Sequence, residues 1–130
     1  MTYADVEKHC MALKGVTLHQ PWGHSRVFKV GGKMFAMIAH EESGEPHGIW
    51  FKAGETSFAI LTKTKGISPC PYLARAKWVA MDGLKPLKPK ELKAYLERAH
   101  LLVAQGLSKK NRGELGIPDM PKEEVFEPFA

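Results

Sequence analysis

The stretch "VFKVGGKMFAMI", Val27 to Ile38, decides the fold, because two apolar runs meet there at a bare glycine pair. Glycine adopts the positive φ angles that a two-residue hairpin turn demands, so the pattern predicts two antiparallel strands. With that turn length, Phe28 pairs with Phe35 and the side chains alternate between the two faces. We expect one face to carry Phe28, Val30, Phe35 and Met37, and the other Val27, Lys29, Met34, Ala36 and Ile38.

The segments on either side of this hairpin alternate between helical and strand patterns. Apolar residues recur at helical spacing over residues 3–13 and again from Pro89 to Gly106, and a threonine-rich run over 56–63 also favours a helix. Strands are expected at residues 16–19, near 49–52 and in "AKWVAMDG". "ISPCPYLA" is expected to be an ordered loop, because it holds two prolines. The order α-β-β-β-β-α-β-α predicts a single α+β domain, an antiparallel sheet with helices packed against it.

Composition fits one soluble domain of 130 residues, 44% hydrophobic and 25% charged. No run of about 18 apolar residues predicts a membrane span, and the polar N-terminus does not look like a signal peptide. Cys10 and Cys70 lie far apart in the chain and form no C-x-x-C pair. Two reduced thiols in a cytoplasmic protein are therefore expected, with a structural disulfide as the alternative.

The charge is unevenly distributed along a chain whose net charge is +5. Residues 63–93 hold eight Lys and Arg against two carboxylates, whereas the residues after 112 are acidic. We therefore expect residues 1–112 to form the domain and residues 113–130 to be an acidic extension, either solvated or attracted to the basic segment. A basic segment of this kind favours a polyanionic partner.

No catalytic pattern is found. The sequence has no P-loop, no G-x-G-x-x-G and no nucleophile elbow, and nothing supplies a base for Cys70. His40 and His47, with Glu41 or Glu45, match no standard metal-ligand spacing. We expect no enzyme activity, no cofactor and no metal.

The three tryptophans have two interpretations. Trp22, Trp50 and Trp78 can stack on nucleobases, but in a small domain tryptophan more often packs in or near the core. Trp78 is the best stacking candidate, because Arg75 and Lys77 precede it closely.

Four motifs in series resemble the MmcQ/YjbR family: "QPWG", "FKVGGKMFA", "PYLARAKWV" and the C-terminal "LLVAQGLSKKNR". The resemblance covers roughly residues 3–112. It implies an α+β fold similar to the frataxin (CyaY-like) fold, and it implies a DNA-binding protein. This chain departs from the family pattern at His100, where the family usually has a tyrosine, and in the segment after Arg112.

Two functions remain open at this stage. One is a sequence-nonspecific DNA-binding protein that contacts phosphates, and the other is a protein- or ligand-interaction module that uses an open sheet face. An enzyme or metal-handling protein ranks below both. The candidate nucleic-acid contacts are Lys29, Lys33, Lys63, Lys65, Arg75, Lys77, Trp78, Lys109, Lys110 and Arg112.

Overall fold

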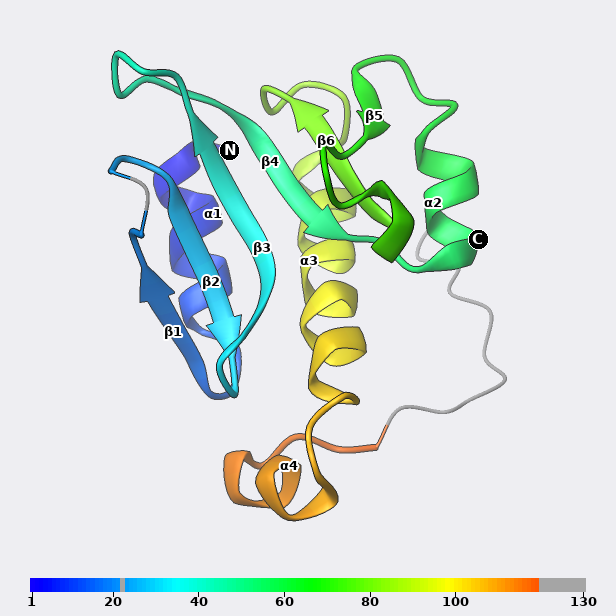
Figure 1. The fold of residues 1–130 in the computed structure, drawn as a ribbon. Coiled ribbons are helices and arrows are strands. Elements are labelled where there is room, and N and C mark those ends of the chain that lie inside the picture. The colour runs from blue at the N-terminus through cyan, green and yellow to red at the C-terminus, as the bar shows by residue number, and fades with distance from the viewer. Residues whose placement is uncertain (22, 120–130) are drawn as a thin grey trace.

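An antiparallel sheet is the frame of the molecule (Figure 1). The computed structural model describes residues 1–21 and 23–119, and its six strands in this part of the chain follow the spatial order β1-β2-β3-β4-β6-β5. The strands are β1 (Val16–His19), β2 (Arg26–Val30), β3 (Lys33–His40), β4 (Pro46–Lys52), β5 (Ile67–Pro69) and β6 (Trp78–Asp82).

The helices confirm the predicted α+β class. They are α1 (Tyr3–Met11), α2 (Glu55–Leu61), the short 3-10 helix η1 (Ala74–Ala76), α3 (Pro89–Ala104) and α4 (Lys109–Leu115). The start of α1 forms a capping box, in which the Thr2 and Asp5 side chains each accept a hydrogen bond from the other residue's backbone N–H.

Two elements differ from the sequence prediction. The loop predicted at "ISPCPYLA" contains β5, because Ile67 and Ser68 pair with β6; Pro69, which lacks an N–H, ends this edge strand. The segment after Gly106, for which the sequence pattern predicts no helix, contains α4, whose N-cap Ser108 accepts a hydrogen bond from the Asn111 N–H. Seven residues are too few to show an apolar period.

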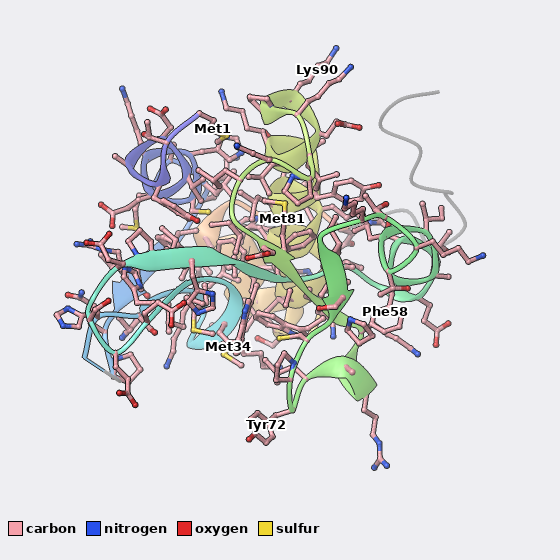
Figure 2. The ribbon with its side chains drawn as sticks, turned by 90° about the horizontal axis from the view of Figure 1, so that it is seen from above. Met1, Met34, Phe58, Tyr72, Met81 and Lys90 are labelled. Atoms are coloured by element: carbon pink, nitrogen blue, oxygen red, sulfur yellow. The ribbon has the colours of Figure 1, made fainter. Side chains whose placement is uncertain are left out.

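Helices α1 and α3 cover only one face of the sheet (Figure 1). The long helix α3 packs on β2, β3 and β4, and its buried face consists mainly of Leu92, Tyr95, Leu96 and Ala99. In the view from above in Figure 2, Met1 and Lys90 lie on the side of the sheet that carries the helices α1 and α3. Met34 and Tyr72 lie on the opposite side of the sheet. One sheet face is therefore left without an α-helix among the described residues.

A β-bulge between β2 and β3 corrects the predicted register. Lys29 pairs with Met34 as expected, but Phe28 pairs with Ala36, so Phe35 is an extra residue on β3. Beyond the bulge every side chain changes face. Ala36 and Ile38 therefore join the core with Phe28, Val30 and Phe35, whereas Met37 leaves it for the open face.

The turn of this hairpin packs on the end of α3 rather than extending into solvent. The Gly31 position, at φ +57°, lies so close to Leu107 that a Cβ there would be 2.6 Å from that side chain. The Lys33 ammonium donates a hydrogen bond to the Gly106 carbonyl at 3.1 Å. Lys33, predicted to reach out to a partner, thus binds a carbonyl just after the end of α3.

His100 is a structural residue, as its position beside the apolar face of α3 suggests. It is 5% exposed, its Nε2 donates to the Lys14 carbonyl at 2.8 Å, and its ring makes an edge contact with Phe35. Burial lowers the pKa of His100, which favours the neutral ring. It joins α3 to the loop after α1.

The predicted boundary after residue 112 falls inside α4. Beyond it, the Gly116 carbonyl accepts a hydrogen bond from the Lys14 ammonium, and Ile117 is buried in the core. The folded unit therefore reaches at least Ile117. Most acidic residues of the predicted extension, Glu123, Glu124 and Glu127, lie outside the described residues.

Two glycines provide opposite tests of this architecture. A Cβ on Gly48 of β4 would lie 2.1 Å from the Met81 carbonyl oxygen, so Gly48→Ala should lower the free energy of unfolding by about 3 kcal/mol.

Gly113, inside α4, has open space around it, so Gly113→Ala should raise the free energy of unfolding by about 1 kcal/mol. Urea denaturation measures both. A loss of stability in Gly113→Ala would contradict the helical assignment of α4.

Candidate ligand-binding groove on the open sheet face

The open face of the sheet holds a groove of about 410 Å³ between strands β3 and β4 and the loop before η1. Its lining is mostly apolar and aromatic, with two histidines at one end, and it includes no Lys, Arg, Asp or Glu. The larger side chains of the lining include Met34, Met37, Trp50, Tyr72, His40 and His47.

Strand alternation and the bulge place the floor of the groove. On β4, Ile49 and Phe51 point into the core, so Trp50 between them faces the other way and is half-buried. The bulge brings Met37 onto this same face, directly opposite Trp50 in the β3–β4 register. On its other side Trp50 pairs with Ala80, whose small side chain leaves room above the sheet.

Tyr72 forms the wall of the groove and has an unusual backbone. Its φ is +65°, a left-handed conformation that costs a residue other than glycine roughly 1–2 kcal/mol, and its side chain is fully exposed (Figure 2). The loop is closed by hydrogen bonds from the Cys70 N–H to the Trp78 carbonyl and from the Trp78 N–H to the Leu73 carbonyl. Such strain in an exposed aromatic residue beside a groove points to a functional role.

A second hollow adjoins the histidine end of the groove. This hollow, of about 290 Å³, is lined by Glu41, Glu42 and His24, and it shares Ser25 and His40 with the groove. The His40 Nδ1 lies 3.0 Å from the Ile38 carbonyl, which can only accept, so Nδ1 carries the proton. The Nε2 of a neutral His40 ring is then a hydrogen-bond acceptor.

Several of the predicted nucleic-acid contacts are engaged within the protein. Lys33 binds the Gly106 carbonyl, and the Lys77 ammonium lies 4.8 Å from the centre of the Phe58 ring. Arg112 donates to the Leu107 carbonyl at 2.8 Å and to Asp119. Trp78 is 3% exposed and offers no ring face for stacking, so it leaves the candidate set. Six other cations are exposed or half-exposed, on β2, the turn after α2, η1 and α4: Lys29, Lys63, Lys65, Arg75, Lys109 and Lys110.

The tryptophans follow their packing interpretation in part. Trp78 is buried, whereas Trp50 is half-buried and forms the groove floor; Trp22 lies outside the described residues. The alternation in "HGIWFK" is the sequence signal that could have placed Trp50 on the open face. Tyr72 carries no comparable signal, because its exposure follows from the fold of the 70–78 loop.

Cys10 and Cys70 are both unreactive thiols at neutral pH. Cys10 and Cys70 are both unpaired and buried, and burial raises the pKa of each thiol to about 12. Neither is therefore a thiolate at neutral pH. Within residues 1–21 and 23–119, no three His, Cys, Asp or Glu side chains come together as a metal site would require. In that same part of the chain, no helix has the length and apolar character needed to cross a membrane.

Fold and groove together define a small α+β protein with one helix-covered sheet face and one open, grooved face. The YjbR family model matches residues 11–102, and the chain belongs to the YjbR family. The crystal structure of Deinococcus radiodurans protein DR2400, described as a DUF419 domain, is 25% identical with a TM-score of 0.78, over 97% of this chain and 96% of that one.

A second solved structure, of a protein from Pseudomonas syringae, shares the fold at 18% identity and a TM-score of 0.66. It covers 78% of this chain and 98% of its own. No curated protein matches the chain. The likeness to the frataxin (CyaY-like) fold stays a prediction.

The strain at Tyr72 predicts that glycine there is more stable than tyrosine. Tyr72→Gly should raise the free energy of unfolding by about 0.5–1 kcal/mol, because glycine takes a positive φ freely and the exposed ring loses no packing. The matched control Ala76→Gly, in the same loop at a negative φ, should lower it by a similar amount. Denaturant titration of both variants compares them. Equal losses in the two would show that Tyr72 is unstrained.

Proposed function

We propose that this YjbR protein is a non-enzymatic binding module, and that the groove on the open sheet face receives a small ligand with an apolar or aromatic body. The observation that carries the proposal is an aromatic-walled groove on the one face that α1 and α3 leave uncovered.

The size and lining of the groove support a small ligand. Binding pockets for such molecules typically enclose about 300–1,000 Å³, with apolar walls and a few polar groups, and 410 Å³ with two histidines fits that description. Tyr72 and Trp50 supply large, rigid rings with little conformational entropy to lose on binding. Their separate positions, on a loop and on the sheet, would let them contact two sides of one ligand.

The remaining chemistry favours binding over catalysis. Both thiols are buried and protonated at neutral pH, and the His40 Nδ1 hydrogen-bonds a backbone carbonyl rather than a carboxylate that would activate the ring. Two unpaired thiols also suit a reducing compartment, so we place the protein in the cytoplasm.

Binding of a neutral fluorescent probe tests the proposal. N-phenyl-1-naphthylamine should bind saturably with a rise in fluorescence, and Tyr72→Ala should weaken its affinity about tenfold, as loss of an aromatic anchor does. Tyr72 is fully exposed, so the variant should keep its fold, and a thermal melt checks this.

The matched control is Ile60→Ala, which removes an exposed apolar side chain from α2, outside the groove lining. Its affinity for the probe should equal that of the unaltered protein. Absence of saturable binding, or equal losses in Tyr72→Ala and Ile60→Ala, would refute the groove as a ligand site. Capture of a protein partner that the probe fails to displace would also count against it.

Sequence-nonspecific DNA binding is a second candidate, supported by the net charge of +5 and the exposure of Lys63, Lys65, Arg75, Lys109 and Lys110. In this mode lysines and arginines contact phosphates and release counterions. The internal contacts of Lys33, Lys77 and Arg112 reduce the candidate set and make this function the weaker of the two.

Fluorescence anisotropy with a labelled duplex at several salt concentrations tests this second function. The slope of log affinity against log salt should be about −0.9 per phosphate contacted, so Lys110→Gln should make it shallower by about 0.9. Lys8→Gln on α1, which removes an exposed lysine that is not a candidate, should leave the slope unchanged. No binding at micromolar protein in low salt would rule the function out.

A further inference from the structure

The polar end of the groove indicates the chemical class of the ligand more narrowly than its apolar walls do. Ser25 and His40 line both the groove and the second hollow, so the two adjoin at these residues, the groove mostly apolar and the hollow mostly polar. A ligand that fills both parts must itself be amphipathic, with an apolar body and a polar head.

The polar part is locally acidic in a basic protein. Glu41 and Glu42 line the second hollow and are exposed. Among the described residues, the ion pairs join Glu97, Glu7 and Asp119 to their partners, and neither Glu41 nor Glu42 takes part in one. These two carboxylates are therefore available to a ligand.

The backbone holds this acidic turn in place. The Glu41 N–H donates to the Glu45 carbonyl at 2.8 Å, and the Gly44 N–H donates to the Glu41 carbonyl at 2.9 Å, which closes the turn. The His24 ring lies against Gly44, where a Cβ would be 3.3 Å from it, so the turn also packs on the loop before β2. The carboxylates thus start from a defined backbone position beside the groove.

His40, which lines this hollow together with His24 and Ser25, also presents an acceptor. A neutral His40 donates through Nδ1 to the Ile38 carbonyl and keeps a lone pair on Nε2. Two carboxylates and an imidazole lone pair together favour a head that donates hydrogen bonds and carries positive charge. They disfavour a carboxylate, sulfate or phosphate head by repulsion.

We propose that the groove selects aromatic amines: the ring lies on Trp50 and against Tyr72, and the ammonium enters the hollow beside Glu41, Glu42 and His40. This assignment rests on the proposed ligand-binding function and adds the chemical class of the ligand. It requires no reaction and no partner chain.

Three probes that share one phenyl–ethyl skeleton separate the head from the body. Phenethylamine carries an ammonium, 2-phenylethanol a neutral hydroxyl, and 3-phenylpropionate a carboxylate. Displacement of N-phenyl-1-naphthylamine, checked by NMR titration of the tryptophan indole N–H signals, should rank them amine, then alcohol, then acid. The amine should bind about fivefold more tightly than the alcohol, which is what one exposed ion pair supplies.

Variants in the acidic turn test the source of that preference. Glu41→Gln combined with Glu42→Gln should abolish the advantage of phenethylamine over 2-phenylethanol and leave the affinity for the alcohol unchanged. Glu45→Gln removes a neighbouring exposed carboxylate that lines neither depression, and it should preserve the advantage.

The outcomes distinguish selectivity for amines from ligand binding in the groove. If N-phenyl-1-naphthylamine binds at Tyr72 but the three probes bind equally, or the acid binds best, the amine assignment is overturned and the groove stands. If the probes bind in the right order but Glu45→Gln acts like the double variant, the selectivity is a long-range charge effect and the assignment also falls. If the fluorescent probe itself does not bind, the proposed function fails first.

Discussion

The β-bulge at Phe35 is the constraint on which the groove depends. One extra residue on β3 reverses the facing of every side chain after it, so Ala36 and Ile38 pack under α3 while Met37 faces Trp50 on the open side. An unbulged hairpin would turn Met37 toward the helix layer and Ile38 toward the open face. The core would then lose a branched aliphatic side chain, and the groove would lose the residue opposite its tryptophan.

Helix α3 determines which face of the sheet is covered and which stays open. It covers β2, β3 and β4 from one side, and its C-terminal part is tied to distant segments, through His100 to the Lys14 carbonyl and through Gly106, just after the helix, to Lys33. With a single long helix and α1 on that side, the fold can bury only one sheet face completely. The second face is therefore left to a loop, and the strained Tyr72 of that loop becomes the groove wall.

The distribution of charge changes how the basic sequence should be understood. Several cations that look like phosphate contacts have internal roles: Lys33 and Arg112 bind carbonyls, and Lys77 lies over the Phe58 ring. Such contacts use the same flexible, charged side chains that DNA binding would use, so a count of lysines overstates the surface available to a polyanion. The acidic turn at Glu41 and Glu42 is the opposite case, because its carboxylates line a hollow.

The sequence by itself determined the class, the family and nearly all of the element order, because apolar period and turn residues are local signals that survive without a structure. It placed α1, β1, the hairpin and α3 within a few residues. It missed β5 and α4, which are short and depend on β6 and on the end of α3. Only the tertiary structure decided the register beyond the bulge, the burial of Trp78 and the exposure of Tyr72. Each of these follows from contacts between segments far apart in the chain, which no local pattern encodes.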